Sequence, residues 1–226
     1  MKVIAHRGAS AVRPENTMAA FEEAIRIGVD AIELDVHRAR DGTLVVLHDD
    51  LVQLDGEWHY VGELSFDELR RLDLGDGERV PGLEAVLEQL RGRCPLMIEI
   101  KAFGLAQPLG AVLRRHGATS DVHVTSFLHE EVVEIGRHCP GIPRSIVLAA
   151  MPIRFETLMR DAGTDEVSLF RGYLNPDITA RLRDHGVTVR AYPVNLPREA
   201  ARMSEWGVAG IFTDDPAAMQ SFRAAG

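Results

Sequence analysis

The 226-residue chain is 46% hydrophobic and 26% charged, an ordinary globular composition that excludes a disordered or fibrous protein. Its 25 basic and 34 acidic side chains give a net charge of −9, which excludes attachment to nucleic acid or to an anionic membrane through overall charge. The length suits one domain, and we predict a single domain over residues 1–226. A phosphate-bearing ligand would have to be bound by a few well-placed cations.

The two cysteines, Cys94 and Cys139, form no CxxC pair, so we expect neither a disulfide framework nor a zinc site. The chain enters a predicted strand at once, and its apolar stretches are shorter than the roughly 18 residues of a membrane span. These features predict a cytoplasmic protein without stable membrane association. They do not define an oligomeric state.

Short apolar runs alternate with longer segments of helical period along the whole chain. The predicted strands are residues 2–6, 31–37, 96–101, 122–126, 144–148, 166–170, 187–192 and 210–213. Six of the helical segments end at a glycine, namely Gly28, Gly92, Gly117, Gly163, Gly186 and Gly207. Eight strands with intervening helices favour a (β/α)₈ TIM barrel over an open doubly wound sheet, whose G-x-G-x-x-G is missing.

One segment interrupts this alternation after the second strand. Residues 44–48 resemble an extra strand, and a mostly polar loop is expected from there to Glu63. Ser65 and Glu68 then form a capping box, which predicts a short helix over 66–72. We therefore predict a small inserted segment at about 49–80. Nearer the N-terminus, Asn16 is the expected N-cap of the first helix.

Three carboxylates occur inside apolar strands. Glu33 and Asp35 alternate with aliphatic residues and so share one face of their strand with His37, and Glu99 repeats the pattern in the next barrel strand. Carboxylates gathered in this way repel one another unless a cation or a shared proton compensates them. Oxygen ligands without a thiol suit Mg²⁺ or Ca²⁺. The competing interpretations are ion pairing of Glu99 with a basic residue and solvent exposure of Glu33.

Two histidines end short apolar strands, His6 in the first and His48 in the extra strand. A pair of imidazoles at one rim suits acid and base catalysis, whereas a lone histidine there is more often structural. Arg7 and Lys101 would supply the placed cations for a phosphate group. The alternative for Arg7 is a salt bridge to Glu33 or Asp35.

Several short motifs follow one another along nearly the whole chain. They are His6-Arg7-Gly8-Ala9, Pro14-Glu15-Asn16-Thr17, Glu33-Leu34-Asp35-Val36, Asp41-Gly42, His48-Asp49, Pro81-Gly82-Leu83-Glu84, Glu99-Ile100-Lys101, Val194-Asn195 and residues 207–216. In this order they resemble the glycerophosphodiester phosphodiesterase family. Each motif alone is weak, and their combination makes the resemblance specific.

The resemblance implies a catalytic (β/α)₈ barrel that hydrolyses small-molecule glycerophosphodiesters to glycerol 3-phosphate and an alcohol. It implies these roles: metal ligands Glu33, Asp35 and Glu99; acid and base His6 and His48; phosphate contacts Arg7 and Lys101; and Glu15 near metal and substrate. The chain departs from the family pattern at residues 52–55 and 192–195, which leaves the preferred alcohol open. Trp58, Phe127 and Tyr192 are candidates for a wall at the leaving group, with loop packing as the alternative.

Two further functions compete with this hypothesis. A lipid phosphodiesterase of the lysophospholipase D kind could use the same chemistry, but no basic amphipathic helix is present in the sequence. A ligand-binding barrel without catalysis would not need both His6 and His48. Since no Ser or Cys stands beside a base at the rim, the nucleophile is expected to be water or the 2-hydroxyl of the glycerol, and the histidine pair favours the second.

Overall fold

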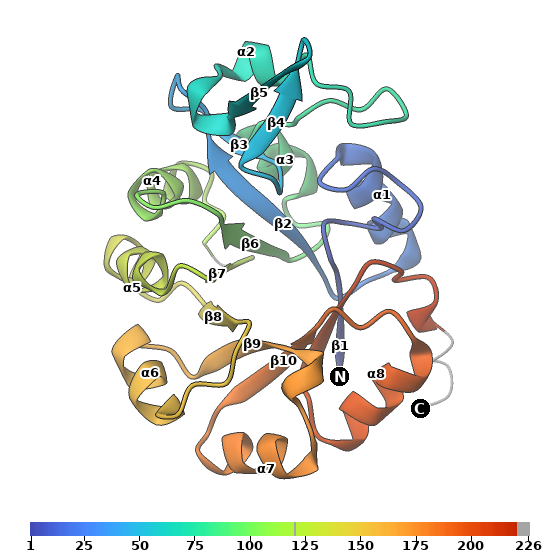
Figure 1. The fold of residues 1–226 in the computed structure, drawn as a ribbon, viewed down its shortest axis with the longest axis vertical. Coiled ribbons are helices and arrows are strands. Elements are labelled where there is room, and N and C mark those ends of the chain that lie inside the picture. The colour runs from blue at the N-terminus through green and yellow to red at the C-terminus, as the bar shows by residue number, and fades with distance from the viewer. Residues whose placement is uncertain (120, 221–226) are drawn as a thin grey trace.

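The computed structural model describes residues 1–119 and 121–220. Its largest sheet contains eight parallel strands that close on themselves, because β1 pairs with β2 as well as with β11 (Figure 1). These strands are β1 (Lys2–Ala5), β2 (Ala31–Arg38), β6 (Leu96–Ile100), β7 (Val122–Ser126), β8 (Arg144–Leu148), β9 (Glu166–Phe170), β10 (Thr188–Tyr192) and β11 (Gly210–Thr213). The predicted barrel is confirmed.

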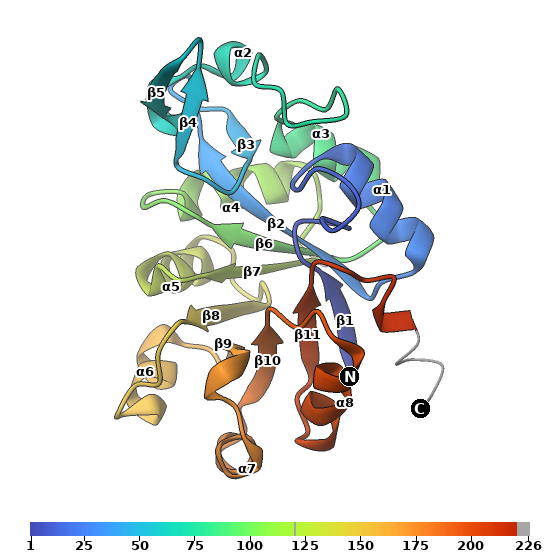
Figure 2. The same ribbon diagram turned by 45° about the vertical axis from the view of Figure 1, so that its right-hand side comes forward.

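The helices surround the strands, and both figures show them outside the closed sheet (Figure 2). They are α1 (Met18–Ile27), α3 (Leu83–Leu90), α4 (Ala106–Arg115), α5 (His129–His138), α6 (Phe155–Ala162), α7 (Pro176–Asp184) and α8 (Pro197–Glu205), with a short 3₁₀ turn η2 (Arg171–Tyr173) before α7. None of the described helices is long and apolar enough to cross a bilayer.

The strand periodicity of β2 divides its side chains between two environments. Ile32, Leu34 and Val36 are fully buried in the layer between strands and helices. Glu33 and Asp35 alternate with them and face the barrel interior, which also holds Ile4, Met97 and Phe212. Burial of the aliphatic face thus fixes the register that directs the carboxylates inward.

The inserted segment follows β2 and lies at one edge of the barrel (Figure 1). It contains β3 (Leu44–Val46), which pairs antiparallel with β2, a hairpin of β4 (Leu51–Leu54) and β5 (Glu57–Tyr60), η1 (Val61–Glu63) and α2 (Phe66–Leu69). The expectation of a polar loop up to Glu63 is wrong, because Val52 and Leu54 are buried and the intervening dipeptide makes a two-residue turn. Asp55 and Gly56 adopt φ of 54° and 87°, as such turns require.

The first helix is capped differently from the prediction. Thr17, not Asn16, is its N-cap, and Thr17 Oγ1 accepts a hydrogen bond from the Ala20 amide at 3.3 Å. Asn16 instead has a φ of 57° and is buried. The capping box of Ser65 with Glu68 is present, although α2 ends at Leu69.

Candidate active site

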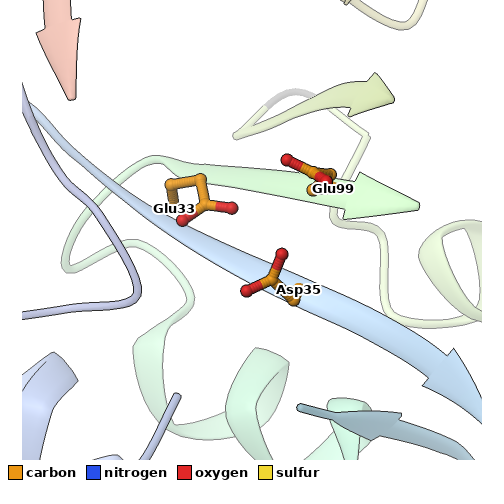
Figure 3. Close-up of side chains that lie close together, drawn as sticks. All are labelled: Glu33, Asp35 and Glu99. Atoms are coloured by element: carbon orange, nitrogen blue, oxygen red, sulfur yellow. The ribbon is translucent and has the colours of Figure 1, made fainter. Parts of the chain in front are cut away.

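Glu33, Asp35 and Glu99, here called the carboxylate trio, gather on two neighbouring strands, with Glu99 near the carboxyl end of its strand (Figure 3). Glu33 and Asp35 come from β2, and Glu99 lies opposite Asp35 on the neighbouring strand β6. One oxygen from each carboxylate lies within 4.8 Å of the others. Catalytic residues of such barrels occupy this end of the strands.

Two basic side chains partly compensate the charge of the carboxylate trio. Lys101 Nζ lies 2.9 Å from Glu99 Oε1 and 3.4 Å from Asp35 Oδ1, and Arg7 Nε lies 3.2 Å from Asp35 Oδ2. The side-chain Nδ2 of Asn16 also donates to Asp35 Oδ2 at 2.9 Å. Three carboxylates therefore face two basic side chains inside a buried region, so one more cation or a proton is needed to balance the charge.

Burial is the main electrostatic influence on two members of the trio. It raises the pKa of Glu33 well above its ordinary value, and the neighbouring Asp35 and Glu99 raise it further. Burial likewise raises the pKa of Glu99, with Asp35 adding to the effect. Burial alone would lower the pKa of Lys101, but the charges of Asp35 and Glu99 outweigh it and raise that pKa.

The donor set fits a hard divalent cation. Glu33 Oε2 accepts from the Arg7 amide at 2.9 Å, whereas Glu33 Oε1 is buried without a hydrogen-bond partner among the described residues. A buried carboxylate oxygen without a partner is costly, and a cation would satisfy it. Carboxylate oxygens are the ligands that Mg²⁺ and Ca²⁺ prefer. The trio is therefore a possible acidic metal site.

Each candidate histidine is paired with a carboxylate. His6 Nδ1 lies 2.6 Å from Asp214 Oδ1, and His48 Nδ1 lies 2.8 Å from Asp49 Oδ1. Both contacts use Nδ1, so the Nε2 atom of each ring is left for other partners. A carboxylate at one ring nitrogen fixes the orientation of the imidazole and stabilises its charged form.

Asp214 is itself held in place from the other side. The side chain of Asn195 donates to Asp214 Oδ2 at 2.6 Å and accepts from the Asp214 amide at 2.9 Å. Hydrogen bonding to His6, followed by that to Asn195, lowers the pKa of Asp214 to about 2. This carboxylate is therefore ionised at neutral pH and can orient His6.

Arg7 occupies a strained turn between β1 and α1. Its φ is 57°, a region that residues other than glycine rarely adopt, and its carbonyl accepts a hydrogen bond from the Asn16 amide at 3.0 Å. One guanidinium nitrogen donates to both oxygens of Glu15, at 3.0 and 2.9 Å. Gly8 follows with a φ of 82°, and a Cβ there would lie 2.7 Å from the Ala20 backbone. The close approach of this turn to α1 thus requires glycine.

A cavity of about 280 Å³ joins these groups. Its lining comprises His6, Arg7, Glu33, His48, Glu99, Lys101, Thr125, Phe127, Val147, Ser168, Tyr192, Pro193 and Phe212. Phe127 and Tyr192 pack edge to face, with 5.9 Å between ring centroids. Burial, with a contribution from Glu99, raises the pKa of Tyr192 to about 12, so its hydroxyl is neutral.

The structure brings most of the predicted site residues to this one cavity. Glu15 reaches it through Arg7, and Asp35 lies behind it with a hydrogen bond from Asn16. Trp58 is different, because it lies on β5 with 65% of its surface exposed and does not line the cavity. His37 shares a strand face with the trio, but its Nε2 contacts the His48 carbonyl at 3.1 Å.

Sequence reasoning missed the groups that hold the histidines and Asp35. Asp214 and Asn195 are about 200 residues away from His6, and only the resemblance of their motifs pointed to this region. Asp49 was recognised as part of a motif without a role. Asn16 was assigned to the helix cap, whereas its side chain contacts Asp35.

Comparison with known proteins identifies the family of this chain. Residues 6–218 match the model of the Glycerophosphoryl diester phosphodiesterase family, and the chain belongs to that family. It is accordingly a phosphoric diester hydrolase with a TIM-barrel fold. A glycerophosphodiester phosphodiesterase of Caldanaerobacter subterraneus is 32% identical, with 95% of this chain and 94% of that protein aligned.

Two further relatives bear on substrate and product. A phosphodiesterase of Oleispira antarctica, solved in complex with the product sn-glycerol-3-phosphate, superposes with a TM-score of 0.91 at 25% identity, covering 99% of this chain and 97% of that one. The human lysophospholipase D GDPD1 is 27% identical over 98% of this chain and 85% of its own length.

Proposed function

We propose that this protein hydrolyses glycerophosphodiesters to glycerol 3-phosphate and an alcohol, within one catalytic domain. The observation that carries the proposal is one cavity lined by Glu33, Glu99, two carboxylate-paired histidines and the cations Arg7 and Lys101, with Asp35 completing the carboxylate trio. The family membership and the product named for the Oleispira antarctica relative support the same reaction.

Glu33, Asp35 and Glu99 would hold the divalent metal, Mg²⁺ or Ca²⁺. When bound, the metal supplies positive charge to the phosphate oxygens and to the attacking hydroxyl. Arg7 and Lys101 bind the same phosphate, Arg7 through its planar fork and Lys101 as a point charge. Glu15 fixes the guanidinium of Arg7 through two hydrogen bonds.

His6 and His48 divide the proton transfers. The 2-hydroxyl of the glycerol attacks phosphorus while one histidine accepts its proton, and the other histidine protonates the alcohol as its bond to phosphorus breaks. This step leaves a cyclic 1,2-phosphate of glycerol. Water then opens the ring with the two histidines in exchanged roles, which yields glycerol 3-phosphate. An intramolecular nucleophile gains up to about 7–11 kcal/mol from proximity.

Asp214 and Asp49 act through these histidines rather than on the substrate. Each contacts Nδ1 of its imidazole, which holds the ring with Nε2 as the proton-transferring atom. Phe127 and Tyr192 form the wall near the leaving alcohol. Trp58 belongs to the exposed surface of the hairpin and takes no part in that wall.

A lysophospholipid substrate is the second candidate function. The relationship to the human lysophospholipase D favours it. The test compares glycerophosphocholine, followed by glycerol 3-phosphate release, with lysophosphatidylcholine, followed by choline release, each with and without divalent metal. Glycerophosphocholine turnover that requires metal supports the proposal. Turnover confined to lysophosphatidylcholine would contradict it, and absence of both would indicate a binding barrel.

A further inference from the structure

The catalytic cavity has two chemically different halves. The half near β1, β2 and β6 carries the ionisable groups described above. The other half is formed by β7, β8, β9 and β11, and its lining residues Thr125, Val147, Ser168 and Phe212 are all buried. Phe127, in contrast, is 42% exposed. The buried residues therefore form a floor, and the exposed aromatic ring marks the mouth.

The hydroxyl of Ser168 on this floor lacks a partner. Ser168 is 1% exposed, and its Oγ has no hydrogen bond among the described residues. Buried hydroxyls on the preceding strands β7 and β8 are paired: Ser145 Oγ donates to Thr125 Oγ1 at 3.0 Å, and Thr125 Oγ1 donates to the Ser145 carbonyl at 3.2 Å.

The contrast between these hydroxyls matters energetically. Buried hydroxyls are normally hydrogen-bonded, because an unpaired one has lost its contacts with water without replacement. Ser145 Oγ also has a contact with His123 Nε2 at 2.9 Å, so this hydroxyl has partners on both sides. Ser168 lines the cavity, so a ligand bound there lies beside this residue. The unpaired hydroxyl thus points to a ligand atom that pairs with it.

The substrate offers two arms to the cavity, on the assumption that the proposed function holds. The departing alcohol varies and has to leave through the mouth, whereas the glycerol arm is small and common to all substrates. A closed floor with apolar Val147 and Phe212 beside one free hydroxyl suits the glycerol arm. Its 2-hydroxyl attacks phosphorus, which leaves the terminal hydroxyl free to bind elsewhere.

We propose that Ser168 hydrogen-bonds the terminal hydroxyl of the glycerol arm and thereby selects glycerophosphodiesters whose terminal hydroxyl is free. Acylation of that oxygen, as in 1-acyl lysophospholipids, removes its proton and adds a chain that the buried floor does not accommodate. A site built to pair with a substrate hydroxyl discriminates strongly against an analogue that lacks it. Ser168 is thus a specificity residue that acts on substrate binding and not on proton transfer.

The test measures kcat/KM for two diesters with metal present. One is glycerophosphocholine, and the other is the phosphocholine ester of propane-1,2-diol, which keeps the attacking 2-hydroxyl but has a methyl group in place of the terminal hydroxymethyl. We expect Ser168→Ala to lose about tenfold to a hundredfold on glycerophosphocholine and little on the analogue. Ser145→Ala is the matched control, since Ser145 is equally buried but does not line the cavity.

The outcomes separate this inference from the proposed function. Loss of the wild-type preference for glycerophosphocholine in Ser168→Ala, but not in Ser145→Ala, supports the inference. An equal decrease on both diesters in Ser168→Ala, or a wild-type enzyme without any preference, overturns it and leaves the proposed function intact. Absence of wild-type turnover on both diesters refutes the proposed function and this subsite with it. Ser168→Cys, which nearly preserves volume, repeats the test if the alanine variant is unstable.

Discussion

Replacing Asp214 by asparagine keeps the shape of the side chain but removes the charge that His6 Nδ1 contacts at 2.6 Å. The amide can then present its NH₂ group to His6 and favour the wrong tautomer of the imidazole. We expect kcat to fall about a hundredfold, because positioned proton transfer contributes about 10² to 10⁴ and Asp214 acts only through His6. KM changes little, since Asp214 does not line the cavity.

The same substitution has a measurable effect on stability. A fall of the Asp214 pKa from 3.8 to about 2 corresponds to roughly 2 kcal/mol of folding free energy, and its 35% side-chain exposure reduces this to about 1 kcal/mol through solvent screening. Because the folded-state pKa is depressed, this contribution is present above the unfolded-state value near 3.8 and is lost as the pH falls through about 2. About half of it remains at pH 3.

The assay combines steady-state kinetics on glycerophosphocholine with urea unfolding at pH 6 and pH 3. Asp215→Asn is the matched control, because Asp215 is the adjacent carboxylate and its Oδ1 accepts from the Ala218 amide instead of from His6. Asp214→Asn with wild-type kcat would refute the orienting role. A difference in unfolding free energy between wild type and Asp214→Asn that grows on acidification would refute the electrostatic reasoning.

The remaining predictions concern the trio, the histidines and the nucleophile. Glu33→Gln or Glu99→Gln should weaken metal affinity, measured by calorimetry, while the fold persists, and a variant that binds metal like wild type would contradict the assignment. For Glu33→Gln the melting temperature of the metal-free protein should not fall, since this carboxylate has no basic side chain paired with it in the part of the chain that the structure describes. His6→Ala and His48→Ala should each lower kcat by about 10² to 10⁴, and the double variant should lower it by less than the product of the two single effects. The pH profile of the wild-type enzyme should be bell-shaped. An unchanged kcat in either single variant would assign that proton transfer to another group. A diester lacking the 2-hydroxyl should bind as a competitive inhibitor without cleavage, and its efficient turnover would establish direct attack by water.

The barrel could be predicted because its strands are apolar, short and separated by helical period, and burial on both faces of a parallel sheet enforces that pattern. The sequence did not reveal the hairpin β4–β5, because its apolar pattern is weak. Only two of the four residues of β4 are buried, and β5 has no fully buried residue. The Asp55-Gly56 dipeptide was the available signal, since both residues tolerate positive φ.

At the site, strand periodicity was sufficient to predict that Glu33 and Asp35 share one face of their strand. The order of the barrel strands then predicted that Glu99 lies on the neighbouring strand. Periodicity does not reveal contacts that depend on tertiary closure. The pairing of His6 with Asp214 arises because β1 and β11 are adjacent in the closed sheet, although they stand at opposite ends of the chain. Asn16 was misassigned because the cap preference of asparagine and its capacity for positive φ have the same sequence signature.

The central claim is metal-dependent hydrolysis of glycerophosphodiesters in this cavity. The most direct measurement is enzymatic detection of glycerol 3-phosphate released from glycerophosphocholine by the purified protein, first after exhaustive chelation and then after addition of Mg²⁺ or Ca²⁺. We predict no release after chelation and restored release with metal, and none in either condition for the double variant Glu33→Gln/Glu99→Gln. Full turnover after chelation, or wild-type turnover in that double variant, would contradict the account.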